Sequence, residues 1–120
     1  MKPRRDGSLV LVACGLVAIL VGCIDPLEGF PLILAGGLLI VIATHRAVRA
    51  RFQLALAGLV LAAVGCAGML VLSALGGVGG TTGLPPIWFV VMAPYPVGAL
   101  LLLAAGFLSL GRARKTARRR

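Results

Sequence analysis

Few side chains in this sequence could do chemistry, and they stand apart from one another. The chain of 120 residues contains one histidine, three cysteines and three acidic residues. Acid–base catalysis needs such groups within hydrogen-bonding reach of a substrate, but the histidine and the acids lie outside the long apolar stretches. The cysteines lack C-x-x-C spacing, and one histidine cannot complete a zinc ligand set with them. We therefore expect no enzyme, no metal site and no cofactor. These residues are His45, Asp6, Asp25, Glu28, Cys14, Cys23 and Cys66.

Cys23 ends a segment that has the form of a bacterial lipobox. The run Leu20-Val21-Gly22-Cys23 follows the basic segment Lys2–Arg5 and an apolar stretch of suitable length. Under this interpretation the chain is cleaved before Cys23, this cysteine is acylated, and three spans remain. A lipoprotein generally continues into a soluble domain, whereas this sequence becomes apolar again from Gly29. We therefore expect the first apolar stretch to be retained.

The run Pro94-Tyr95-Pro96 interrupts the last apolar stretch. Proline has no amide hydrogen, so the carbonyls of Val90 and Met92 lose the helical hydrogen bonds that residues 94 and 96 would otherwise donate. In hydrocarbon these carbonyls need other partners. One interpretation is a helix break that lines a small cavity, with Tyr95 as its polar group. The other is a helix that begins at Pro94, which the sequence favours because 17 residues still follow up to Leu110.

The composition indicates that the elements carrying these residues belong to a membrane protein. Hydrophobic residues make up 60% of the chain and charged residues 12%, with a mean hydropathy of +1.09. A soluble domain has about 45–50% apolar and about 25% charged residues, so this chain has too little polar surface for a water-soluble globule. It is also far too hydrophobic for a disordered chain. Ten arginines against two lysines, and no asparagine, are typical of a GC-rich bacterial genome.

Four uncharged apolar stretches predict four membrane-spanning helices. They cover residues 8–24, 29–44, 54–75 and 87–110, and a basic tail follows at 111–120. At about 1.5 Å per residue the two longer stretches exceed the roughly 30 Å of a hydrocarbon core, and the two shorter ones reach about 25 Å. Bilayer thinning and snorkelling of Arg46 and Arg49 close this gap. We expect residues 1–120 to form one all-α membrane domain.

The basic residues predict the orientation of this domain. Cytoplasmic loops of membrane proteins are enriched in lysine and arginine, and the net charge here is +9. In a four-span topology all twelve bases fall on one side of the membrane, whereas the opposite loops carry no base and the first of them contains Asp25 and Glu28. We predict that both termini are cytoplasmic and that the protein lies in a bacterial cytoplasmic membrane.

Small residues recur along the predicted spans at intervals that let two helices approach closely. Residues 15–23 and 58–66 also share six of nine positions, which hints at an internal duplication. We predict that the small residues are packing faces that join the spans into a compact four-helix bundle. On the first and third spans they are Gly15, Ala18, Gly22, Gly58, Ala62 and Gly65.

The basic tail and the lack of a catalytic group define the expected function. Bases next to a span attract anionic phospholipid head groups, and nucleic acid is not expected because no aromatic residue is interleaved with them. We expect a non-enzymatic accessory or structural membrane subunit, with lipid, a second copy or another membrane protein as its partner. The alternative is an oligomeric pore or small transporter, including a holin-like lytic protein. The bases are Arg112, Arg114, Lys115, Arg118, Arg119 and Arg120.

Overall fold

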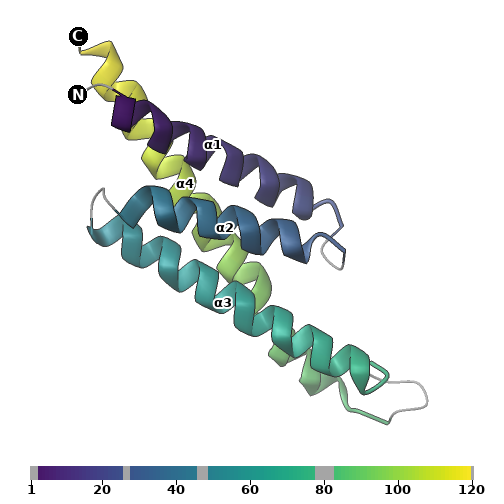
Figure 1. Ribbon diagram of the computed structural model, residues 1–120. Coiled ribbons are helices and arrows are strands. Elements are labelled where there is room, and N and C mark those ends of the chain that lie inside the picture. Colours follow the sequence, from purple (N-terminus) through teal and green to yellow (C-terminus); the bar gives the residue numbers. More distant parts are fainter. Residues whose placement is uncertain (1–2, 26–27, 46–48, 78–82, 120) are drawn as a thin grey trace.

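A computed structural model of the chain describes residues 3–25, 28–45, 49–77 and 83–119. These residues are helical apart from short connections, and they contain no strand, which confirms the all-α prediction. In Figure 1 consecutive helices run in opposite directions, and the two termini lie at the same end of the molecule. The elements are α1 (Pro3–Gly22), α2 (Phe30–His45), α3 (Arg49–Ala74), the 3-10 helix η2 (Pro86–Met92) and α4 (Pro94–Arg118).

Glycine and proline set two of the helix boundaries. After α3 the chain turns at Gly76, whose φ is 92°, a value that glycine adopts without the steric cost of a Cβ atom. The Gly76 amide donates to the Ser73 carbonyl and the Gly77 amide donates to the Leu72 carbonyl, which is the Schellman pattern of a helix C-terminus. Helix α4 begins with Pro94 in its first turn, where the missing amide hydrogen costs nothing.

The helices differ from the predicted apolar stretches at four main places. Helix α1 begins at Pro3 instead of residue 8, and α3 begins at Arg49 instead of residue 54. The tail that was predicted from residue 111 continues α4 as far as Arg118. The stretch 87–110 is also not one helix, because η2 and α4 are separate on either side of Ala93. Arginine, alanine and lysine are good helix formers, so a helix extends beyond the apolar residues that hydropathy detects.

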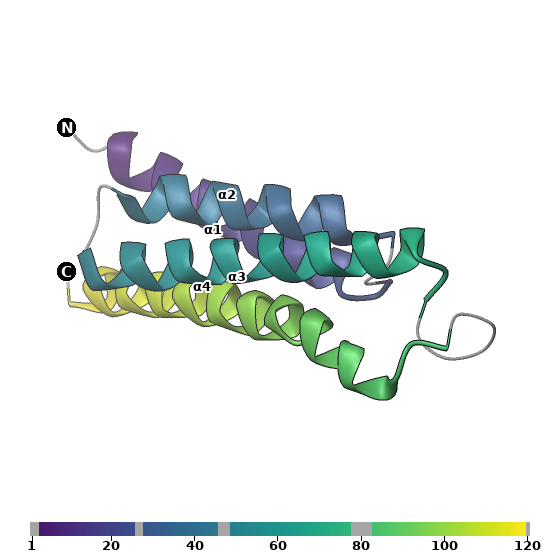
Figure 2. The ribbon, with the colours of Figure 1, turned by 90° about the horizontal axis from the view of Figure 1, so that it is seen from below.

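The four α-helices lie side by side in a long, narrow array of 63 × 23 × 19 Å (Figure 2). Each helix contacts its neighbours in the chain, and α4 also contacts α1 and α2. Among the described residues α1 makes no contact with α3. Of the described helices, α3 and α4 are the ones that η2 contacts, so it extends the second hairpin beyond the first one.

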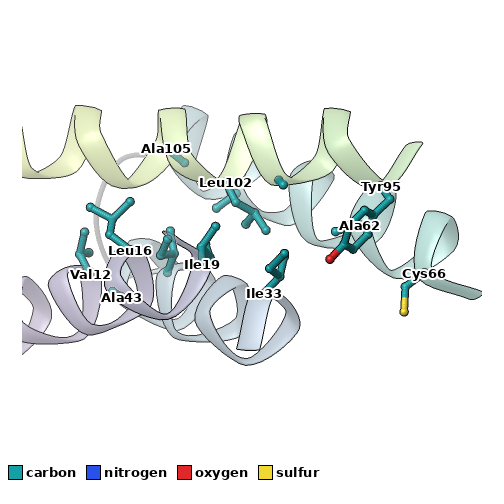
Figure 3. Packing of buried hydrophobic residues seen from close by; sticks show 13 residues of the cluster. Val12, Leu16, Ile19, Ile33, Ala43, Ala62, Cys66, Tyr95, Leu102 and Ala105 are labelled. Carbon is teal, nitrogen blue, oxygen red and sulfur yellow. The ribbon is translucent and has the colours of Figure 1, made fainter. Parts of the chain in front are cut away.

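The core is a line of apolar side chains along the axis of this array. Ile19, Ile40 and Leu102, from three different helices, are fully buried. Figure 3 shows Leu102 above the side chains of α1 and α2, with Tyr95 and Ala62 further along the axis. Helix α3 contributes mainly small residues such as Ala55 and Ala62, which lets the backbone of α4 approach it closely.

Candidate functional site

Large apolar side chains cover the outside of all four α-helices. Eight of them, on the central turns of the helices, are each more than half exposed. In soluble monomers, apolar patches larger than a few hundred Å² mark interaction sites. We call this surface the apolar belt; it comprises Val10, Val17, Leu38, Ile42, Val60, Val64, Leu100 and Phe107.

The charged side chains lie at the two ends of the array, beyond the apolar belt. Arg49 and Arg51 begin α3, and five bases end α4, so these groups share the end where the termini lie (Figure 1). We call it the basic end. The opposite end carries Asp25 and Glu28 between α1 and α2, and we call it the acidic end. Lys2, Arg46 and Arg120 lie outside the described residues. We call five bases the α4 bases: Arg112, Arg114, Lys115 and Arg118 in the helix, and Arg119 as its C-cap.

His45 belongs to the basic end and has an aromatic neighbour. Its ring lies edge-on to Phe52, with 5.0 Å between the ring centroids and 70° between the planes. This contact joins the end of α2 to the beginning of α3. Among the described residues no group of three histidine, cysteine or acidic side chains is placed to hold a metal ion.

Glycine pairs bring the backbones of α1 and α2 into contact. A Cβ atom on Gly15 would lie 2.7 Å from the carbonyl oxygen of Gly36, and one on Gly36 would lie 2.6 Å from the carbonyl oxygen of Gly15. Two turns further along α1, a Cβ atom on Gly22 would lie 2.7 Å from the Gly29 carbonyl oxygen. Ala18 lies between them, 3.1 Å from the Cβ position of Gly36. We call this contact the first seam.

A second seam joins α3 to α4. A Cβ atom on Gly58 would lie 2.9 Å from the carbonyl oxygen of Gly98, and one on Gly98 would lie 2.8 Å from the Cα atom of Ala62. A Cβ atom on Gly65 would meet the backbone of Tyr95, 2.6 Å from its Cα atom. No side chain fits at these glycines unless one helix moves. The structure thus places all six of the predicted packing residues in the two seams.

Three further glycines are close to neighbouring side chains, and sequence reasoning did not single them out. A Cβ atom on Gly37 would lie 2.7 Å from Leu102, one on Gly106 would lie 2.5 Å from Leu16, and one on Gly68 would lie 2.6 Å from Val91. Gly106 follows Gly98 by eight residues, two helix turns along the same face, and this spacing was the available signal.

The few polar side chains inside the array have hydrogen-bond partners. The Thr44 hydroxyl, which is almost completely buried, donates to the Ile40 carbonyl at 2.8 Å. The Ser8 hydroxyl of α1 donates to the Ala43 carbonyl of α2 at 3.2 Å. Among the described residues no buried side-chain nitrogen or oxygen lacks a partner.

The Pro94-Tyr95-Pro96 segment starts a helix. The Ala93 amide donates to the Val90 carbonyl at 3.2 Å, so this carbonyl has a partner although residue 94 cannot donate to it. Tyr95 is 5% exposed and packs on Gly65. Tyr95 and Pro96 also line a groove.

That groove has a volume of about 760 Å³ and is open to the surrounding medium. Cys23 follows α1 at one side of it, Ile33 of α2 and Met69 of α3 contribute to its walls, and η2 and α4 form the remainder. We call it the apolar groove. Cys23 and Cys14 are exposed, whereas Cys66 is buried.

Two helical segments are long and apolar enough to cross a membrane. They are Arg49–Ala74 and the combined η2–α4 segment Pro86–Arg118. The other two apolar helical segments, Gly7–Gly22 and Phe30–His45, are shorter. Comparisons of the chain with protein-family models, with curated proteins and with solved structures find no match.

Proposed function

We propose that this chain is a four-span protein of a bacterial cytoplasmic membrane, with both termini in the cytoplasm, and that it acts as a non-enzymatic accessory or structural subunit. The observation that carries the proposal is the apolar belt between two ends of opposite charge. Exposed aliphatic side chains are stable in hydrocarbon, and charged groups are stable only outside it. The array therefore matches the layering of a bilayer.

The helix lengths are compatible with four crossings. The apolar part of α1, Gly7–Gly22, and α2, Phe30–His45, each have 16 residues, which gives about 24 Å. A hydrocarbon core of roughly 30 Å accommodates a shorter helix by local thinning, at a fraction of a kcal/mol per Å. Helix α2, the shortest of the four α-helices, packs between α1 and α3 and also contacts α4, so its neighbours support it on several sides.

The interior supports a structural role better than a transport role. Transport of a polar solute or ion requires polar groups along a path through the protein. The buried residues in the described part of the chain are apolar apart from Thr44 and the phenol of Tyr95, and Thr44 donates to its own helix. The two seams are instead rigid backbone contacts, which suit a scaffold that presents fixed outer surfaces to other membrane proteins.

The basic end is proposed to bind anionic phospholipid head groups. On the α4 helix the five described bases fall within an arc of about 160° when they are projected at about 100° per residue. Ala113, Thr116 and Ala117 occupy the remaining arc. Each base near an anionic surface contributes about 1 kcal/mol of attraction, which salt weakens. This end therefore has the chemistry of a cytoplasmic membrane anchor.

Reporter fusions along the full chain test the proposed topology. Fusions after Gly7, near Val48 and at Arg120 should report cytoplasm, because all twelve bases then lie on the side that favours them. Fusions near Leu27 and Gly80 should report the outside. An external signal at Arg120 would overturn the four-span topology, and disagreement at Leu27 alone would exclude the second span.

A further inference from the structure

The apolar groove is walled mainly by η2 and α4. Met92 of η2 lines it together with Pro96, Ala99 and Leu103 of α4. The spacing of three and four residues places the three α4 residues on one face over about 10 Å, so this wall of the groove runs along α4. The volume of about 760 Å³ lies within the range of about 300–1,000 Å³ that is usual for ligand pockets. An apolar wall along a helix face suits an extended hydrocarbon chain.

The chemistry of the lining excludes water and polar solutes as stable occupants. A bound water needs two to four polar partners. The lining offers the Cys23 thiol and the Tyr95 phenol, and otherwise carries side chains such as Ile33, Met69 and Leu103. An open apolar volume of this size is therefore filled by hydrocarbon when hydrocarbon is available.

The groove opens beside the apolar belt. Phe89 and Leu100 line it and are 58% and 65% exposed, so its rim faces the same medium as the rest of that surface. If the array spans a bilayer as proposed above, the groove axis is parallel to the lipid chains. An acyl chain can then enter sideways without a change in its direction.

The charges near the groove distinguish between head groups. Cys23 lies at the groove, and the carboxylates of the acidic end, Asp25 and Glu28, follow it in the chain. The described bases lie at the opposite end of the array. Carboxylates repel an anionic head group and attract an ammonium group. A primary ammonium group also donates hydrogen bonds to carboxylate oxygens, which a quaternary ammonium group cannot do. The head group that fits here is therefore zwitterionic with a primary amine.

We propose that the apolar groove binds one acyl chain of phosphatidylethanolamine, whose ammonium group lies near Asp25 and Glu28. This inference rests on the proposed membrane-spanning function. It goes beyond that function because it assigns a specific lipid site on the side opposite to the basic end. The lipid would fill the space between the two hairpins where α1 and η2 do not touch.

Native mass spectrometry of the full chain tests this site. The protein is purified in a mild detergent and is mixed with equal amounts of phosphatidylethanolamine and phosphatidylglycerol. The described bases at the end of α4 are first replaced by glutamine, because the basic end would otherwise bind phosphatidylglycerol and mask the groove. In this background we expect one bound phosphatidylethanolamine, with a preference of about twofold to fivefold over phosphatidylglycerol, since exposed ion pairs are weak. Cys23→Trp places an indole ring at the groove and should reduce the bound fraction about fivefold, because the ring occupies space that the acyl chain would fill. The matched control Cys14→Trp changes the other exposed cysteine, which is not part of the groove, and should retain the lipid.

A double variant, Asp25→Asn with Glu28→Gln, tests the head group separately. Asparagine keeps the oxygen that accepts the Glu28 amide at 3.4 Å, so the turn is preserved while both charges are removed. We expect a bound phospholipid that has lost its preference for phosphatidylethanolamine. Unchanged preference in this variant, or equal lipid binding by the two tryptophan variants, would overturn the proposal.

Two further measurements distinguish failure of the lipid-site proposal from failure of the membrane-spanning function. A covalent acyl mass on Cys23 that survives denaturation would mean that the chain's own acyl group fills the groove, and this would overturn the proposal of a free phospholipid. Release of the chain from membranes by alkaline carbonate would contradict the membrane-spanning function itself. A chain that resists carbonate but shows no groove-dependent lipid retains that function and loses only the lipid site.

Discussion

Replacing Gly65 by alanine tests the second seam directly. A Cβ atom at this position would lie 2.6 Å from both the Cα and the Cβ atom of Tyr95, and closer still to its amide nitrogen. Favourable contact between such atoms begins at about 3.5 Å, so α4 would have to move away by about 1 Å. Overpacking of this kind costs about 1–3 kcal/mol. Alanine's higher helix propensity returns up to about 1 kcal/mol, so we expect a net loss of about 1–2 kcal/mol.

The matched control is Gly111→Ala. Gly111 also lies in α4, and a Cβ atom there would meet nothing within 4 Å. Only helix propensity acts at this site, so we expect the free energy of unfolding to stay equal or rise by up to about 1 kcal/mol. Reversible unfolding in mixed micelles, followed by circular dichroism as the denaturing detergent is increased, measures both variants. Equal stability of the two would refute the assignment of Gly65 to a packing seam.

Two further predictions concern Cys23 and the basic end. The intact mass of the purified protein should include the N-terminal segment, and Cys23→Ala should leave its abundance unchanged, because Gly15 and Gly22 of α1 pack on α2 in a way that a discarded signal peptide would not need. Incorporation of labelled palmitate that disappears in Cys23→Ala would contradict this. Replacing the five described α4 bases by glutamine should remove about 1 kcal/mol of anionic-lipid attraction per base. Competition between spin-labelled phosphatidylglycerol and phosphatidylcholine at low and high salt measures this loss, and a preference that neither salt nor the replacement changes would exclude the basic end as its source.

The helices could be predicted because their signals are local. The apolar runs around Leu16, Ile40 and Leu59 are each long enough to be recognised without any partner, and Pro94 marks a helix start through its missing amide hydrogen. The extension of α4 to Arg118 was not predicted. The prediction relied on hydropathy, which ends a span at the first charged residues, whereas arginine and lysine have a high helix propensity. Hydropathy and helix propensity therefore predict the same helix along the apolar residues and differ at the two ends of the apolar stretch.

The sequence predicted which small residues form packing faces, but not which faces contact each other. Gly15 and Gly58 could be recognised as members of small-residue faces. Their partners could not be predicted, because a small-residue face on one helix can pack on a similar face of any other helix. The structure pairs Gly15 with Gly36 and Gly58 with Gly98. The related segments 15–23 and 58–66 thus each occupy the first helix of a hairpin and pack on the helix that follows.

By itself the sequence determined the helical class, the number of long apolar stretches and the exclusion of charged residues from them, since all three depend on the transfer preference of single residues. The tertiary structure alone decided which backbones touch, that α1 does not reach α3, and that a groove remains between Cys23 and Leu103. These features depend on shape complementarity between whole helix faces. In hydrocarbon, where every face is equally apolar, close packing is the main difference between one pairing and another.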